Sequence, residues 1–494
     1  MTKPVNDVSR RDFLRRSTLG AAAVGALQVS AAARVLGANE RLRVGFVGVG
    51  SSRARCQAHI GTILKMQREG RNIEAAAICD VFNRYRDETA CKIKSMGGVA
   101  PQVSGDYRDL LANRDLDVIV VATPDHWHAR MTIEALEAGK AVYCERPMTH
   151  TIAESQEVLQ AWKRTGGIVQ VGVQSTSDGR WRAAHEFIRT GGIGKVLQAQ
   201  TSYYRNSGMG QWRYYGLSHD MTPRNIDWPM FLGTQFGLAD DMPFDRAKFG
   251  QWRCYWPFGH GLYSDLFVQQ LTRMLVAAGV RYPRRVVSSG GIFLEYDGRD
   301  VPDTATLVAD YEEGLQILIT STMCCDYPIE HCIRGHYGTL TFDSGNNKDG
   351  FDFIPERPQV TRQRDSQRKH TSAFKPVDET YAHWENFLEA IELRDPLHCH
   401  NPPDLGAAAV ATVLLGAESY RTGRVMEWDN EQACIANSGE GYARQWEALS
   451  QGRSAPRQIN GWSPANDNPQ FSRQRPEDYQ KLEGPWHDGR DPAV

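Results

Sequence analysis

The sequence predicts an α/β protein: an N-terminal, doubly wound parallel sheet, then a C-terminal α+β domain with a large open, mostly antiparallel sheet. Three observations support this prediction. Short apolar runs alternate with helical segments up to about residue 174. From about residue 175, strand-like runs follow one another with few helices between them. The 494 residues are enough for two or three domains.

The parallel sheet is predicted from five apolar runs within residues 39–174, each typical of a buried strand. These runs are 41–50, 73–80, 117–123, 140–144 and 167–174. Helices are predicted between them. One covers Ala129–Ala138 and ends at Gly139, and another opens with the capping box Thr151-Ile152-Ala153-Glu154.

The open sheet is predicted within residues 175–430, with helices on one face and the other face free to pair with a second subunit. The predicted strands are 196–204, 285–294, 305–311, 315–322 and 338–343, and the predicted helices are 383–393 and 403–421. Glu312-Glu313-Gly314 suits a hairpin turn. Residues 356–377 are polar and basic, which predicts a surface loop.

Both ends of the chain differ from these domains. Arg10-Arg11 before Phe13-Leu14, an apolar stretch and small residues up to Ala33 resemble a twin-arginine export signal over 1–38, with a periplasmic destination. The alternative is an ordinary amphipathic helix. Residues 431–494 are predicted to form an extended, docked arm, because the last 44 residues contain six prolines and several large aromatics.

The composition excludes several classes of protein. Apolar residues make up 41% and charged residues 23%, which excludes disorder as the main state. The net charge of −2 does not favour a nucleic-acid partner. Ten cysteines are too sparse for a disulfide scaffold. The longest apolar stretch, residues 19–33, is too short and too rich in Ala and Gly for a membrane span.

A dinucleotide site is predicted where the first strand ends. Gly48-Val49-Gly50 allows a tight turn, so that backbone N–H groups approach a pyrophosphate. The adjoining candidates are Ser51, Ser52 and Arg53; Arg53 occupies the usual third glycine position, and Ala54 follows. The alternative is a plain strand–turn–helix connection.

The cofactor is predicted to be NAD. Asp80 ends the second strand, where a carboxylate accepts hydrogen bonds from ribose hydroxyls and repels a 2′-phosphate. Asp80 also suits a helix N-cap. Arg84 could accommodate a 2′-phosphate, so NADP stays open.

Three strand-end motifs then carry a resemblance to a known family. They are Thr123-Pro124-Asp125-His126-Trp127-His128, Glu145-Arg146-Pro147 and Gln170-Val171-Gly172-Val173-Gln174. Their order resembles the glucose–fructose oxidoreductase/inositol dehydrogenase (Gfo/Idh/MocA) family, in particular its exported branch. The resemblance implies a Rossmann domain, an NAD(P)-dependent reaction at a sugar or polyol hydroxyl, and a homodimer or homotetramer. It assigns cofactor contacts to Thr123, Pro124, His126, His128, Glu145, Arg146 and Gln174.

Two departures from the family pattern concern the catalytic residues. The family lysine after Glu145 is replaced by Arg146, which cannot lose its proton but can stabilise an alkoxide. The family Asp-x-x-x-His is kept only as Asp265, because Gln269 stands at the histidine position and cannot act as a base. His260 and Tyr255 are candidate substitutes. Burial would raise the pKa of Asp265 and Arg146 would lower it, so its role as base stays open.

A substrate surface is predicted from stretches rich in aromatic and arginine side chains, which suit sugar rings or acidic sugars. The candidates are Tyr204, Arg205, Trp212, Arg253 and Tyr255. The alternative is an irregular loop packed over the sheet. No metal site is predicted, because the local His/Cys groups lack paired zinc spacing.

The predicted function is an NAD(P)-dependent oxidoreductase for a sugar or sugar derivative. An exported enzyme meets no free nicotinamide pool, so the cofactor must stay bound and be recycled. Retention equally suits redox-neutral glycoside processing, in which transient oxidation precedes elimination or hydrolysis. A third reading is a nucleotide-loaded, non-catalytic sugar-binding protein, because Arg146 and Gln269 replace titratable groups.

Overall fold

The computed structural model describes residues 41–344, 347–357, 370–373, 377–429, 434–436 and 447–448. The predicted signal 1–38 and most of the predicted arm 431–494 lie outside these ranges. The chain divides between Glu40 and Arg41, and every described residue belongs to the unit that begins at Arg41. Within the described part, no helix is both long and apolar enough to cross a membrane. Export and periplasmic location stay predictions.

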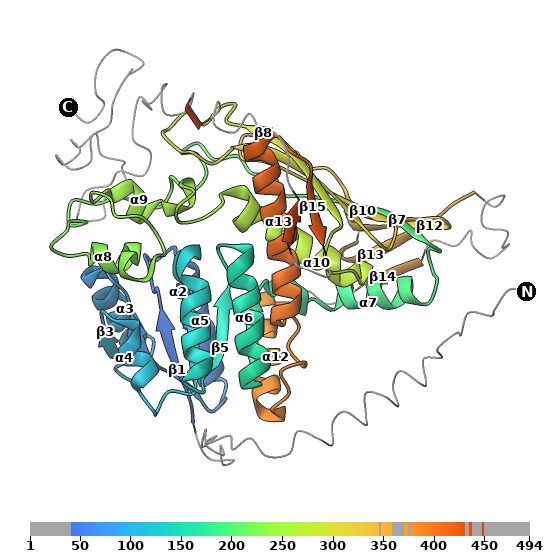
Figure 1. Cartoon of the computed structure of the whole chain (residues 1–494). Coiled ribbons are helices and arrows are strands. Elements are labelled where there is room, and N and C mark those ends of the chain that lie inside the picture. Colours follow the sequence, from blue (N-terminus) through green and yellow to red (C-terminus); the bar gives the residue numbers. More distant parts are fainter. Residues whose placement is uncertain are drawn as a thin grey trace, which may run out of the picture. The chain divides into compact units, whose positions relative to one another are not determined.

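The first sheet is parallel and has the strand order β3-β2-β1-β4-β5-β6 (Figure 1). Its strands are β1 (Leu42–Val47), β2 (Ile73–Cys79), β3 (Gln102–Ser104), β4 (Val118–Val121), β5 (Ala141–Glu145) and β6 (Val169–Gly172). Each of the five apolar runs forms one of them, whereas the short, mostly exposed β3 was not predicted. The order reverses between β1 and β4, and ligands bind at such a reversal in open α/β sheets.

The helices of this sheet connect its parallel strands. They are α2 (Arg55–Arg68), α3 (Asn83–Ser95), α4 (Tyr107–Ala112), α5 (His128–Glu137) and α6 (Ile152–Thr165). The predicted capping box is present, since Thr151 and Glu154 exchange side-chain hydrogen bonds with each other's backbone N–H. Gly139 follows α5 with a φ of 73°, in agreement with its predicted place after the helix.

The second sheet has the order β14-β13-β12-β11-β7-β10-β9-β8-β15-β16. Its strands are β7 (Val196–Ser202), β8 (Arg285–Gly291), β9 (Thr304–Tyr311), β10 (Leu315–Thr322), β11 (His331–Gly335), β12 (Gly338–Ser344), β13 (Asn347–Pro355), β14 (His370–Ala373), β15 (Met426–Asp429) and β16 (Cys434–Ala436). Only β7 and β10 pair in parallel among these described strands. The predicted mostly antiparallel sheet is therefore confirmed, and so is the hairpin at Gly314, which joins β9 to β10.

Helices cover one face of the second sheet. Alternate residues of β9 and β10 are buried, as expected for strands with one covered face. The helices are α7 (Gly179–Arg189), α10 (Val268–Ala278) and α13 (Pro403–Thr422), while α12 (Glu379–Leu393) packs on α2. In Figure 1, α13 lies beside α6 of the first layer, and it also contacts β8. Pairing of the other face in a homodimer or homotetramer stays a prediction.

The structure corrects one prediction and adds several strands. Residues 356–377 were predicted as a surface loop, but His370–Ala373 form β14 and pair with β13. An edge strand tolerates polar side chains, so its composition gave no strand signal. The short strands β11 and β13 were also not predicted, because neither is a long alternating apolar run.

Candidate active site

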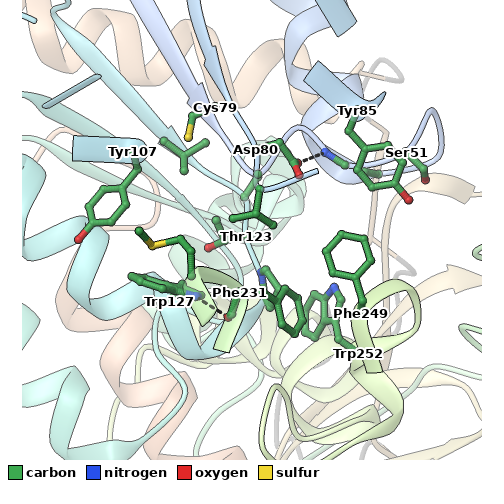
Figure 2. Close-up of a pocket in the computed structure, with 18 of the residues that line it drawn as sticks. Ser51, Cys79, Asp80, Tyr85, Tyr107, Thr123, Trp127, Phe231, Phe249 and Trp252 are labelled. Carbon is green, nitrogen blue, oxygen red and sulfur yellow. Dashed lines mark hydrogen bonds between the residues drawn. The ribbon is translucent and has the colours of Figure 1, made fainter. Parts of the chain in front are cut away.

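A cavity with about 950 Å³ of free space, part of it open to solvent, lies at the carboxyl ends of β1, β2 and β4 (Figure 2). The predicted cofactor residues that line it are Gly48, Gly50, Ser51, Asp80, Thr123 and Pro124. Ser52 and Arg53 are exposed beside it, and Arg53 donates a hydrogen bond to the carbonyl of Tyr214 at 3.1 Å.

The turn after β1 requires its two glycines. Gly48 and Gly50 have φ values of 78° and 59°, which disfavour other residues. A Cβ on Gly48 would lie 2.8 Å from the backbone of Thr123, and one on Gly50 would lie 2.5 Å from Cβ of Ala54. Helix α2 begins next, with Ala54 as an N-cap that offers no side-chain bond. Its first N–H groups are therefore suited to an anion such as a pyrophosphate.

Asp80 is held in place by the turn itself. Its carboxylate accepts N–H groups from Gly50 and Phe82, each at 2.9 Å (Figure 2 shows the Gly50 bond). Burial raises its pKa, although both N–H groups act in the opposite direction. The N-cap of α3 is Phe82, so Asp80 is not that cap. Arg84 pairs with Glu88 and Asp220, both at 3.0 Å, and is thus not open for a 2′-phosphate.

A segment that follows β7 closes the cavity, and we name residues 215–253 the clasp. It contains α8 (Trp228–Leu232), α9 (Arg246–Gly250) and the start of a short 3₁₀ turn, η4 (Trp252–Cys254). In Figure 2, Phe231, Phe249 and Trp252 lie across the cavity from Asp80 and Thr123. The clasp is joined to the chain just after Asp80, because the N–H of Asn83 donates to Asn225 at 3.1 Å and that of Asp227 to Val81 at 3.0 Å.

His126 and His128 were predicted to contact the cofactor, but neither lines the cavity. Nε2 of His126 lies 2.9 Å from the carbonyl of Phe231 in the clasp, so this nitrogen carries the hydrogen. The ring of His128 lies between the carbonyls of Pro147 and Thr123, at 2.6 and 2.9 Å. Burial lowers the pKa of His126 to about 3 and also lowers that of His128. Both side chains hold loops in place.

Glu145 is a buried carboxylate surrounded by donors. His59 Nε2 and Gln174 Nε2 lie 2.7 Å from it, and Arg55 Nε lies at 3.4 Å. Trp384 donates to Nδ1 of His59 at 3.0 Å, so Nε2 of His59 carries the hydrogen that Glu145 accepts. Burial alone would raise the pKa of Glu145, but these donors and the neighbouring charges hold it well below its usual range.

The partners of Glu145 were not predicted from the sequence. Arg55 and His59 lie four residues apart and thus on one face of α2, which is a signal that was available in the sequence. Trp384 comes from α12, more than 300 residues away, and no local pattern could connect it. The predicted residues Glu145 and Gln174 do not line the cavity but form its second layer.

Arg146 joins Glu145 to Asp265. Its two terminal nitrogens donate to Glu145 at 3.3 Å and to Asp265 at 3.2 Å. Asp265 lies in a π-helical turn, η5 (Tyr263–Phe267), a rare element that is frequent at functional sites. Trp212 donates its indole N–H to Asp265 at 2.9 Å. Trp212 is fully buried with a φ of 65°, an unusual backbone state for a bulky residue.

These contacts settle the charge of Asp265. Burial raises its pKa, but the guanidinium charges of Arg253 and Arg146 outweigh burial and leave the pKa below its usual value. Asp265 is therefore ionised at neutral pH. A group of this kind orients a donor or stabilises positive charge, and it takes up a proton only weakly.

Gln269 and His260 lie at the two ends of this turn. Oε1 of Gln269 is buried with no partner among the described residues. It is suited to accept a hydrogen bond from a hydroxyl group. The ring of His260 packs between His150, at 4.5 Å, and Trp256, at 5.7 Å. Burial lowers its pKa well below the usual value, so this imidazole is neutral.

Asp125 is a titratable group that the sequence analysis did not select. It is 2% exposed, and accepts the hydroxyl hydrogen of Ser264 from η5 at 2.8 Å. Burial raises its pKa to about 7, although the charge of Arg253 and the bond from Ser264 act against this. A raised carboxyl pKa beside Asp265 is typical of an active site.

Asp125→Asn is expected to stabilise the protein at about pH 8 and to stabilise it less at about pH 5, where part of the contribution of the carboxyl is still present. Folding raises the pKa of Asp125, so the protonated form favours the folded state. That contribution is complete below the unfolded pKa and is lost as the pH rises through about 7. Differential scanning fluorimetry at both pH values measures this, with the exposed Asp326→Asn as control. An equal change in melting temperature at both pH values would contradict the assignment.

Two of the five predicted substrate residues support the site, and the other three differ in what they contact. Tyr255 and Trp212 support the site, since the Tyr255 hydroxyl accepts a bond from Arg213 at 3.2 Å and Trp212 is fully buried. Arg253 lines the cavity with its Nε 3.8 Å from Asp265. The charge of Arg205 also acts on Asp265. The Tyr204 hydroxyl lies 3.4 Å from Thr320 Oγ1 on β10.

Metal ligands do not gather here. Among the described residues, no group of three or more His, Cys, Asp or Glu side chains could hold a metal ion.

Comparison with known proteins identifies the first sheet. Residues 42–173 match the model of the oxidoreductase family with an NAD-binding Rossmann fold. A glycosyl hydrolase family 109 protein from Shewanella sp. (strain W3-18-1) is 29% identical over 188 residues, covering 35% of this chain and 39% of that protein. The chain thus matches about two fifths of the length of such curated relatives.

Solved structures share both sheets at low sequence identity. A levoglucosan dehydrogenase in complex with NADH and levoglucosan is 18% identical, with a TM-score of 0.53 over 76% of this chain and 98% of that one. An NAD-binding oxidoreductase from Klebsiella pneumoniae is also 18% identical, with a TM-score of 0.59 over 78% and 99%. At this identity the likeness establishes the fold.

Proposed function

The chain belongs, through residues 42–173, to the Gfo/Idh/MocA oxidoreductase family with an NAD-binding Rossmann fold, and we propose that it is an NAD-dependent oxidoreductase acting on a sugar or sugar derivative. The observation that carries the proposal is the path of the cavity. It runs from Asp80 to Arg253, and Arg253 lies against Asp265. The Arg146–Asp265 pair therefore adjoins the Arg253 end of the cavity, where the second half of a nucleotide would be held.

Different residues of the chain are assigned to nucleotide binding and to the chemical step. Gly48, Gly50 and the start of α2 suit the pyrophosphate, and Asp80 suits ribose hydroxyls. Bound NAD supplies a hydride acceptor or donor for a carbon of the sugar. Arg146 stabilises negative charge on the reacting oxygen, because it keeps its proton. Asp265 accepts a hydrogen bond from the reacting hydroxyl and orients it.

The proposal includes a cofactor that stays bound and is recycled in place. The clasp supports this, because its aromatic side chains cover the cavity and its backbone bonds to residues 81–83. The export predicted from Arg10-Arg11 gives a reason for retention, since an exported enzyme meets no free nicotinamide pool. That segment lies outside the described residues.

A second candidate function is redox-neutral processing of a glycoside, in which a sugar carbon is oxidised, the glycosidic bond is broken, and the hydride is returned. The names of the glycosyl hydrolase family 109 relatives favour it. Release of a free sugar with no net change in the nicotinamide would identify this cycle. A bound nucleotide that no sugar or glycoside reduces or oxidises would instead identify a non-catalytic binding protein.

We expect the purified protein to contain NAD or NADH rather than NADP or NADPH. Asp80 is buried where a 2′-phosphate would lie, and Arg84 is already paired with carboxylates. Mass spectrometry of the supernatant after denaturation identifies the nucleotide. Substrates that change the nicotinamide absorbance of the intact protein then test the oxidoreductase assignment. Bound NADP would contradict the preference for NAD, and the absence of any nucleotide would contradict the oxidoreductase assignment.

A further inference from the structure

The substrate end of the site contains more positive than negative charge. Arg146, Arg253 and Arg205 surround Asp265, while Glu145 is shared between Arg146 and Arg55. Both carboxylates are ionised, because the pKa of each lies below its usual range. Asp125 adds a negative charge only above about pH 7. The three guanidinium groups at this end, those of Arg146, Arg253 and Arg205, therefore face Asp265, and Arg146 also pairs with Glu145, while Arg55 belongs to the first turn of α2.

Arg253 is the guanidinium best placed to bind a ligand. It lines the cavity and stacks on the ring of Trp252, with its centre 4.1 Å from the ring centroid. Within the described residues it makes no hydrogen bond, and its Nε lies 3.8 Å from Asp265. A stacked guanidinium with open N–H groups is the usual fork for a carboxylate.

Arg205 and Arg146 add to the same field. The charges of Arg205 and Arg253 both act on Tyr214, so both guanidinium groups lie near that phenol. Arg205 bonds to the hydroxyl of Tyr203 and keeps its other N–H groups for solvent or ligand. Nε of Arg146 is buried and has no partner among the described residues. Unpaired buried donors are costly unless a ligand satisfies them.

We propose that the substrate is a sugar that carries a carboxylate, of the hexuronate class, with its carboxylate bound by Arg253 and Arg205. This inference rests on the proposed function, since it names the substrate class of the same site. Nearby aromatic side chains, Trp252 and the phenols Tyr203 and Tyr214, suit the sugar ring. A neutral hexose would leave the excess positive charge uncompensated.

Isothermal titration calorimetry of the nucleotide-loaded protein tests the preference with four probes. These are D-glucuronate and D-galacturonate, each compared with the neutral hexose of the same configuration. We expect the better uronate to bind at least about tenfold more tightly than its hexose, as one charge-assisted fork contact provides. Added salt should weaken the binding of the uronate and leave the binding of the hexose unchanged.

Two variants locate the preference. Arg253→Gln should reduce the uronate-to-hexose ratio to below about threefold, because the amide keeps a hydrogen-bond donor without the charge. Arg334→Gln is the matched control: Arg334 lies on β11, bonded to Gln198 and Gln200, and should keep the wild-type ratio. Equal affinity for uronate and hexose, or an unchanged ratio in Arg253→Gln, would overturn the proposal.

The same probes separate this inference from the proposed function. If hexoses change the nicotinamide absorbance while uronates neither bind nor react, the acidic preference is wrong and the oxidoreductase assignment stands. If uronates bind preferentially but no sugar of either kind changes the absorbance, the binding preference stands and the oxidoreductase assignment fails.

Discussion

Replacing Glu145 by Gln is expected to lower the free energy of unfolding by about 3–5 kcal/mol, as breaking a buried ion pair from one side does. The carboxylate is 4% exposed and compensates Arg146, with Arg55 beside it. It also accepts the hydrogen bond that Nε2 of His59 donates. An amide of the same shape replaces one acceptor oxygen by an NH2 donor, which faces the surrounding donors, and removes the charge.

Urea unfolding followed by tryptophan fluorescence measures this change. Glu137→Gln is the matched control, since Glu137 pairs with Arg164 at the surface, where about half of each side chain is exposed. Exposed pairs contribute about 0–1 kcal/mol, so this control should unfold near the wild-type midpoint. A Glu145→Gln midpoint equal to that of the control would show that the buried network is not what stabilises the site.

Asp265→Asn is expected to lower kcat by about 10²-fold with the sugar or glycoside that the wild type turns over, as the loss of a group that positions the reacting hydroxyl does. Asparagine keeps the oxygen that accepts the Trp212 N–H, but it removes the charge that faces Arg146. Because the nucleotide contacts lie elsewhere, the variant should still co-purify with bound cofactor. The change therefore falls on the chemical step.

The control for this variant is Asp310→Asn, which removes a carboxylate paired with Arg285 on the second sheet. It should keep the wild-type kcat. Single-turnover change of the nicotinamide absorbance separates the chemical step from product release. A kcat within twofold of the wild type for Asp265→Asn would remove Asp265 from the mechanism.

The residues that line the cavity at the ends of β1 and β2 could be predicted because their signals are local. Gly48 and Gly50 directly follow a buried strand, and Asp80 ends the next one. Periodicity likewise predicted both sheets, since runs such as β9 and β10 alternate along their whole length. Each of these signals lies within a few residues of the feature it predicts.

For the residues around Asp265, the sequence predicted candidates but not the contacts between them. Trp212 bonds Asp265 across 53 positions, and Ser264 bonds Asp125 across 139. Neither pair leaves a spacing pattern, because the chain brings them together through the packing of two sheets. The pKa directions of Asp265 and Asp125 follow from these contacts, so the sequence alone left the identity of the base open.

Helix α13 has a consequence for how a ligand enters. Most of its 20 residues are buried, and it packs on α6 of the first layer and on β8 of the second. A helix packed on both layers in this way couples them, so we do not expect the cavity to shut by domain closure. Water must then be excluded by motion of short segments, and the rate of product release becomes a property of loops rather than of domains.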